Sequence, residues 1–297
     1  LYYLDLVRFY EFKPNNYTSR PEVEGLSCVL ALETETMEEA RENGRAKVED
    51  VYAQIFADLA KAEELLAGYK RTSIAMPDLS VVYGLYAKAY LEYGEKDNTA
   101  FAKAADYARK AVAQGKYTPL TQKQWEDPVN GFNNHTSNNS WMWCSSLVKE
   151  DYVVKSSILN FISWISSETV FGYAPAGPYR MIDARLYSRI PASDWRKKMW
   201  KAPEGVTVDQ KFVPATASYA GPDNIPDYGA IKFRPGSGNP DAADPGAVVD
   251  YPFMRMEEMM LIIAEADARK GSSAGLVEFM TNRNPDYVCT ASGVDAL

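Results

Sequence analysis

The sequence is poor in the residue types from which most metal and acyl-transfer sites are built. It contains one histidine, His135, and three cysteines, Cys28, Cys144 and Cys289. The cysteines are far apart and show no C-x-x-C spacing, which argues against a zinc site and against a disulfide framework, so we expect buried thiols. Any Ser-His-Asp triad or Cys-His pair would depend on His135 alone. We therefore expect no cofactor and no metal.

Long apolar runs and basic clusters are also missing. No stretch approaches the roughly 20 apolar residues that cross a bilayer, and the start of the chain does not have the pattern of a signal peptide. Residues 1–10 have the pattern of a helix interior with no cap before it, so we expect the chain to be clipped upstream. The net charge is −8 and basic residues cluster only at 196–198. A nucleic-acid partner is therefore excluded.

What the sequence does contain is helical periodicity. Residues 79–115 show apolar positions at steps of three and four in two segments, separated by a polar turn and lined by small alanines. This pattern predicts a tetratricopeptide-like helical hairpin, which needs stacked neighbours to bury its faces. The same period predicts a helix over 47–67 and a second hairpin from 253–271 and 274–282. In the capping-box spacing, Thr36 and Glu39 start a short helix.

Residues 117–252 differ from these helical segments in composition, with many Pro, Gly, Asn and Ser and only short apolar runs. We expect an irregular insertion that contains two short strands, one over 140–147 and one over 229–234. Period-two alternation would place Trp141 and Trp143 on the same side of the first strand. The predicted fold is a single domain over 1–297, mostly α. Helical segments 1–116 and 253–282 form the scaffold, and the loop-rich subdomain 117–252 supplies the ligand surface.

Six segments in the same order resemble the SusD/RagB family. They are ENGRAKVEDVYAQIFADLAKAEELL (42–66), YGLYAKAYLEYG with AADYARKAVAQGKYTPL (83–120), IDARLYSRIPASDWRKKMW (182–200), IKFRP (231–235), PFMRMEEMMLIIAEADARKG (252–271) and LVEFMTNRNPDY (276–287). The chain departs from the family pattern at Gly44, where proline is usual, and it lacks the lipobox and the first helices.

The resemblance implies a function as well as a SusD-like fold. It implies a non-catalytic, outward-facing lipoprotein of the outer membrane, held by a lipid anchor that this chain does not contain. Such a protein captures an oligosaccharide or another nutrient and delivers it to a SusC-type TonB-dependent porin.

Sugar rings stack on exposed aromatic side chains and bond to neighbouring polar side chains, and loops on a rigid scaffold commonly supply both. Residues of this character in the insertion and in an Asn/Tyr loop near the start are the candidate ligand-binding set: Trp164, Phe171, Tyr173, Tyr179, Trp141, Trp143, Asn138, Asn139 and Tyr17. Trp164, Tyr173 and Tyr179 are preferred. For Trp141 and Trp143 a role in the core is the competing interpretation.

Two other function classes stay open. A glycoside hydrolase on a helical scaffold would use two carboxylates, but Glu168, Asp183 and Asp194 show no spacing that singles out an acid and a base. A tetratricopeptide adaptor would bind peptides in a groove, but its repeats would not be interrupted by more than a hundred residues. The sequence does not name the sugar, and a peptide ligand is an alternative to a glycan.

Overall fold

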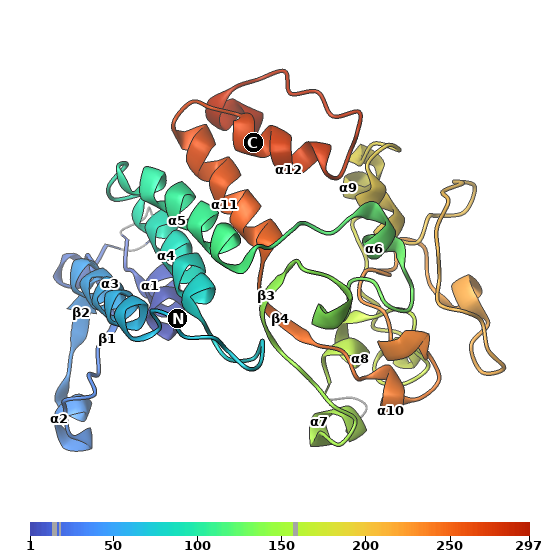
Figure 1. Ribbon diagram of the computed structural model, residues 1–297, viewed down its shortest axis with the longest axis horizontal. Coiled ribbons are helices and arrows are strands. Elements are labelled where there is room, and N and C mark those ends of the chain that lie inside the picture. Colours follow the sequence, from blue (N-terminus) through green and yellow to red (C-terminus); the bar gives the residue numbers. More distant parts are fainter. Residues whose placement is uncertain (14–16, 18, 157–159) are drawn as a thin grey trace.

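The structure is a computed structural model that describes residues 1–13, 17, 19–156 and 160–297. Figure 1 shows helices packed on one side of the molecule and an irregular, loop-rich region on the other. The helices are α1 (Tyr2–Tyr10), α2 (Met37–Glu42), α3 (Val48–Leu65), α4 (Leu79–Tyr93), α5 (Ala100–Gly115), α6 (Gln122–Glu126), α7 (Tyr152–Lys155), α8 (Phe161–Ile165), α9 (Ala184–Arg189), α10 (Ala243–Gly246), α11 (Met256–Arg269) and α12 (Ala274–Thr281). The strands are β1 (Leu26–Val29), β2 (Arg45–Lys47), β3 (Trp141–Ser145) and β4 (Tyr251–Arg255). The mostly α fold class is confirmed.

The hairpin of α4 and α5 forms as predicted. Asp78 caps α4 by accepting hydrogen bonds from the backbone N–H groups of Ser80 and Val81. The two helices lie close together because the α5 face that meets α4 is lined by small side chains that are fully buried, such as Ala104 and Ala108. The hairpin is therefore held by close backbone approach as well as by apolar burial.

Neighbouring helices bury the two outer faces of the hairpin. On one side α11 packs against α5 and α12, in a core that includes Met259, Met260 and Phe279. On the other side α3 packs against α4, and α1 packs against α3, in a core that includes Val51 and Tyr86. The capping box that starts α2 is also present. The tyrosines on α4 lie in or against these clusters, so their role is in packing.

Strands β3 and β4 pair antiparallel at the junction between the helical side and the irregular region (Figure 1). Two predictions at this junction were wrong. Residues 253–255 belong to β4, so the late helix begins at Met256 and not at 253. Register shifts on both sides of Trp143 break the alternation of β3, so Trp141 and Trp143 pack in different clusters.

The predicted strand over 229–234 was also wrong, because its residues form only two isolated bridges, through Gly229 and Ala230. The irregular region is instead held by a buried ion pair. The Arg234 guanidinium contacts both carboxylate oxygens of Glu168 at 3.1 Å, and both side chains are almost fully buried. Glu168 also accepts from the backbone N–H of Val213, and Arg234 donates to the Lys211 carbonyl.

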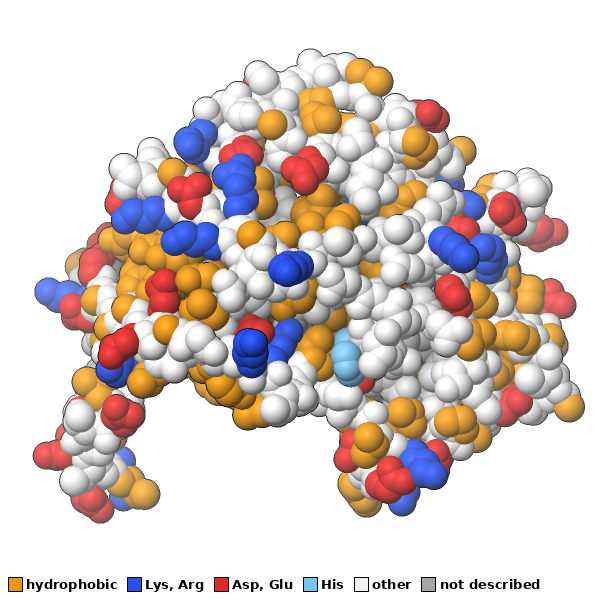
Figure 2. All heavy atoms as spheres, viewed as in Figure 1, with side chains coloured by type: hydrophobic (Ala, Val, Ile, Leu, Met, Phe, Trp, Pro, Cys, Tyr) orange, Lys and Arg blue, Asp and Glu red, His pale blue; other side chains and the backbone are white. Residues whose placement is uncertain are grey.

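Cys28 and Cys144 are buried thiols as predicted, whereas Cys289 is partly exposed, which corrects the third prediction. Acidic and basic side chains are interspersed over the face shown in Figure 2, and apolar side chains gather over the helical side. None of the helices in the described ranges is long and apolar enough to cross a membrane.

Candidate ligand-binding surface

The preferred aromatic candidates meet on one surface of the irregular region. The Trp164 side chain is 52% exposed, and its ring lies edge-to-face with Tyr173, with centroids 5.2 Å apart. The Arg180 guanidinium lies 3.8 Å from the centre of the Trp164 ring. We call Trp164, Tyr173 and Arg180 the aromatic platform. No carboxylate or carbonyl among the described residues accepts a hydrogen bond from the Arg180 guanidinium, and Arg180 is only partly buried, so its N–H donors are free for a ligand.

Local structure explains why Trp164 is exposed. The side chain of Asn160 caps the short helix α8, and Ile162 anchors the other side of that helix in a core cluster. The Tyr173 backbone N–H donates to the Ser163 carbonyl, which brings the following loop onto the helix. Gly172 makes this approach possible, because its φ is +75° and a Cβ there would lie 2.1 Å from the Ser163 Cβ.

Tyr179, the third preferred candidate, lines a pocket of about 210 Å³ on the same loop. Its hydroxyl donates to the Asn224 carbonyl at 3.2 Å. Thr169 and Tyr219 also line the pocket, and the buried Tyr219 hydroxyl has no hydrogen-bond partner among the described residues. Burial raises the pKa of Tyr219, so this hydroxyl stays protonated and can donate. The pocket therefore offers hydroxyl groups beside the aromatic platform.

Two of the sequence candidates are in the core and cannot offer a ring to a ligand. Phe171 is 9% exposed and packs with Val249 and other apolar side chains, so its loop brings Tyr173 but not Phe171 to the surface. Trp141 is 2% exposed and packs against Phe132. Trp143 is partly buried; its ring lies edge-to-face with the exposed Phe253.

The remaining candidates are apart from the platform. Asn138 and Asn139 have their amide groups engaged with backbone carbonyls, those of Asn134 and Lys116. Tyr17 is 98% exposed, but its neighbours at 14–16 and 18 lie outside the described residues. Sequence reasoning missed Arg180 and Asn224. Arg180 directly follows Tyr179, so a search for donors beside each candidate ring could have found it.

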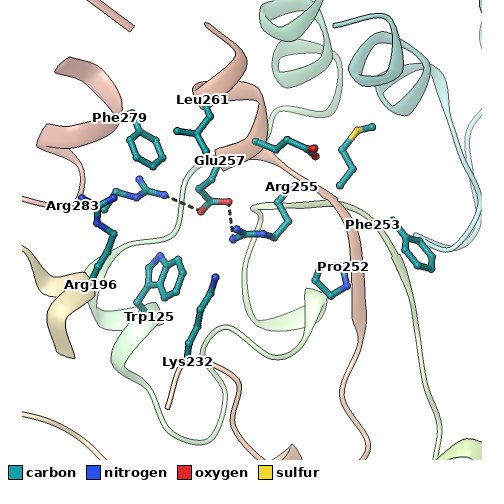
Figure 3. Close-up of a pocket in the computed structure, with 12 residues that line it drawn as sticks. Trp125, Arg196, Lys232, Pro252, Phe253, Arg255, Glu257, Leu261, Phe279 and Arg283 are labelled. Atoms are coloured by element: carbon teal, nitrogen blue, oxygen red, sulfur yellow. Dashed lines mark hydrogen bonds and ion pairs between the residues drawn. The ribbon is translucent and has the colours of Figure 1, made fainter. Parts of the chain in front are cut away.

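A second concave site lies at the junction of the two sides of the molecule. This cleft has a volume of about 410 Å³, and Figure 3 shows Glu257 at its centre, between Arg255 and Arg283. The Glu257 carboxylate is 3.2 Å from the Arg255 guanidinium and 3.5 Å from that of Arg283. It also accepts from the Ser140 hydroxyl and from the backbone N–H of Leu120. Glu257 is thus fully committed to its neighbours.

Lys232 is a further charged group in this cleft, and its ammonium lies within 5.2 Å of three ring centres, those of Trp125, Phe132 and Phe233. Burial lowers the pKa of Lys232 to about 7, with Arg255 acting in the same direction. Burial also lowers the pKa of Arg255 and takes that of Arg283 to about 10. The cleft is therefore rich in confined positive charge.

Four segments of the sequence supply the cations of this cleft. Arg196, Lys232, Arg255 and Arg283 come from the same stretches that resemble the SusD/RagB family, around 182–200, 231–235, 252–271 and 276–287. Asp194, on the first of these stretches, is buried and holds Arg196 through both carboxylate oxygens. Asp194 and Arg196 therefore have a structural role here.

A third cluster brings together potential metal ligands. The ligand atoms of His135, Cys144 and Asp250 lie within 4.8 Å of one another. The His135 Nδ1 is 2.6 Å from the Asp250 carboxylate, which also accepts from the His135 backbone N–H. Burial raises the pKa of Cys144 to about 12, so its thiol stays protonated. These contacts account for the cluster as a hydrogen-bonded link between the loop that contains His135 and the residue that precedes β4.

No protein-family model matches the chain, and no curated protein matches it. Solved structures do. A SusD-like carbohydrate-binding protein from Bacteroides vulgatus superposes with a TM-score of 0.65 and 22% identity, over 98% of this chain and 54% of that one. SusD superfamily proteins from Parabacteroides distasonis and Bacteroides thetaiotaomicron both superpose with a TM-score of 0.61 and 17% identity, over 89% and 96% of this chain and 57% and 56% of theirs.

These likenesses confirm the SusD-like fold that the sequence motifs predicted. The chain spans little more than half the length of each of these proteins. At such identities the likeness concerns the fold, and function has to be argued from the sites of this chain.

Proposed function

We propose that this chain is part of a non-catalytic, cell-surface glycan-binding protein that captures an oligosaccharide and passes it to a SusC-type TonB-dependent transporter. The SusD-like fold supports this proposal, and one similar structure is described as a carbohydrate-binding protein. The proposed cellular setting is the outer membrane, where a lipid anchor would hold the protein.

The observation that carries the proposal is the aromatic platform. Half of the Trp164 side chain is in solvent, where its apolar ring can cover the C–H face of a sugar. Arg180 lies against the same ring with its N–H donors available to sugar hydroxyls. Tyr179 and the pocket that it lines extend this surface with further hydroxyl groups. A flat ring beside outward-facing donors is the chemistry that a pyranose needs.

The carboxylates support a binding role over hydrolysis. Glycosidases place an acid and a base or nucleophile on opposite sides of the scissile bond, each free to reach the substrate. In this chain the buried carboxylates of Glu168, Asp194 and Glu257 are each held by arginine guanidinium groups. Glu258, which also lines the cleft, is paired with Lys88 at 2.8 Å. Held carboxylates of this kind stabilise a fold and do not transfer protons to a ligand.

Isothermal titration calorimetry against a panel of neutral oligosaccharides tests the platform. We expect Trp164→Ala and Tyr173→Ala to weaken binding by roughly tenfold each, since loss of a stacking contact costs about 1.5 kcal/mol. Tyr2→Ala is the matched control, because Tyr2 is an exposed aromatic residue on α1, at 84% exposure. If both platform variants keep every affinity of the wild type, the proposed site is wrong.

Chromatography of the same oligosaccharides after long incubation tests the enzyme alternative. We expect unchanged chain lengths, and shortened products would overturn the non-catalytic assignment. A peptide library screened against the wild type tests the adaptor alternative. For the transport step, we expect the full-length protein to co-purify with a SusC-type transporter from outer membranes, and its recovery alone would contradict the proposed partner.

A further inference from the structure

The junction cleft has more positive charge than its own carboxylates can match. Its side chains and their ion-pair partners comprise five cations, Arg196, Lys232, Arg255, Arg283 and Lys88, and three carboxylates, Asp194, Glu257 and Glu258. Asp194 holds Arg196, Glu258 holds Lys88, and Glu257 is shared by the two remaining arginines. Lys232 has no ion-pair partner among the described residues.

Two hydrogen-bond donors in the cleft also lack an acceptor. The Trp125 side chain is 5% exposed, and its Nε1 has no hydrogen-bond partner in the described part of the chain. The Lys232 ammonium is stacked on ring faces and donates to no oxygen of a described residue. Figure 3 shows the Lys232 side chain extended into the cleft beside the Trp125 ring, with its ammonium directed toward Glu257 and Arg255. Both groups are donors only, so what satisfies them must be an acceptor.

Part of the cleft wall is apolar. Pro252, Phe253, Leu261 and Phe279 line it, and Phe253 is 51% exposed at its edge. A volume of about 410 Å³ holds a ring as well as an anionic group. A ring beside the anionic group would cover apolar surface that a bare inorganic anion would leave in contact with water.

We propose that the junction cleft binds the carboxylate group of an acidic sugar, with Lys232 and Trp125 as the donors and the apolar walls around the ring. The choice of a sugar as the carrier rests on the proposed glycan-binding function, whereas the anion site itself rests on the charges and donors of the cleft. A carboxylate fits better than a phosphate because Lys232, which has no ion-pair partner among the described residues, offers one positive charge. That charge matches a carboxylate, whereas a phosphate carries nearly two negative charges.

Binding of such an anion depends on the protonation of Lys232. The groups that face its ammonium are Arg255 and Arg283, which disfavour the charged form, and Glu257, which favours it. The Arg196 guanidinium and the Glu258 carboxylate also line the cleft. We expect affinity for a carboxylate to be higher at about pH 6 than at about pH 8.5, because the ammonium form of Lys232 is then dominant.

Calorimetry with glucuronate, with glucose as the neutral control, tests the site. We expect Lys232→Met to weaken glucuronate binding by about tenfold or more, in line with the loss of a charge-assisted hydrogen bond. Trp125→Phe removes the Nε1 donor and keeps a ring, and we expect a smaller loss. Lys149→Met is the control, since the Lys149 side chain is 70% exposed and does not line the cleft. No glucuronate binding, or an equal loss in the control, would overturn the proposal.

Two further measurements distinguish this proposal from a general anion site and from the proposed aromatic platform. If inorganic phosphate binds as tightly as glucuronate and competes with it, the cleft is a general anion site and the sugar assignment is wrong. Trp164→Ala reports on the aromatic platform alone. Neutral oligosaccharides that fail to bind, together with glucuronate that binds in a Lys232-dependent way, would reject the proposed platform and support the cleft.

Discussion

Lys232 offers a pH-dependent test of the junction cleft that needs no ligand. Its ammonium is confined between aromatic rings, and burial lowers its pKa from 10.5 to about 7. Lys232→Met keeps most of the apolar stem and removes the charge. We expect this variant to be more stable than the wild type at low pH, because the wild type must bury a charged ammonium there.

The magnitude follows from the displacement of the pKa. A fall from 10.5 to about 7 corresponds to about 5 kcal/mol at 1.36 kcal/mol per pH unit. The Lys232 side chain is partly exposed, and its ammonium is attracted to three ring faces, which both reduce this penalty. We therefore expect the buried charge to cost about 2 kcal/mol of stability. Because the folded-state pKa of this base is lowered, the unfolded chain binds more protons between pH 7 and 10.5. The stability of the wild type therefore rises with pH across that window, and the full penalty is present below it.

Urea unfolding of the wild type and of Lys232→Met at about pH 6 and about pH 9, in buffers without carboxylates, measures this difference. We expect the advantage of the variant to be about 2 kcal/mol at the lower pH and to be smaller at the higher one, where part of the buried ammonium has lost its proton. Lys149→Met should show no such change. A wild type that is more stable than Lys232→Met at pH 6, or a difference that does not vary with pH, would refute the reasoning.

Other substitutions test the fold that positions the sites. Glu168→Gln should lower the free energy of unfolding by about 3–5 kcal/mol, because it leaves the buried Arg234 guanidinium without its counter-charge. Arg185→Gln, in an exposed ion pair, is the control and should change the free energy of unfolding by less than about 0.5 kcal/mol. Similar losses in the two variants would contradict the role of the buried pair. Gly172→Ala should lower the stability in thermal unfolding by roughly 2 kcal/mol and weaken glycan binding, because φ at this position is positive and the added Cβ would contact Ser163. No effect on either stability or binding would count against the loop geometry. Asp78→Ala should cost about 1 kcal/mol in urea unfolding through loss of the α4 cap, and an unchanged midpoint would contradict that role.

The helical part of the fold could be predicted from the sequence because its information is local. The period of 3.6 residues over 79–115 identifies both helices, and Asp78 and Gly115 lie at their ends. The strands could not be predicted as well, since pairing depends on a partner far along the chain. Residues 252–255 are as apolar as the helix that follows, and only their pairing with β3 makes them a strand.

The sequence identifies the aromatic residues of the candidate surface but not which of them are exposed, because exposure also depends on distant parts of the chain. Trp164 and Phe171 have similar sequence surroundings, yet Trp164 points to solvent and Phe171 enters a core cluster that includes Val249. Exposure of an aromatic ring is a tertiary property that neighbouring residues do not encode. The junction cleft was missed because its cations come from four segments, each of which suggested a structural role when considered alone.

A crystal structure of the protein with a bound neutral oligosaccharide tests the proposed glycan site most directly. We expect a sugar ring in van der Waals contact with Trp164, with at least one hydroxyl accepting a hydrogen bond from the Arg180 guanidinium. A sugar bound on the helical side, or anywhere without contact to Trp164, Tyr173 and Arg180, would contradict the assignment of the aromatic platform as the binding surface.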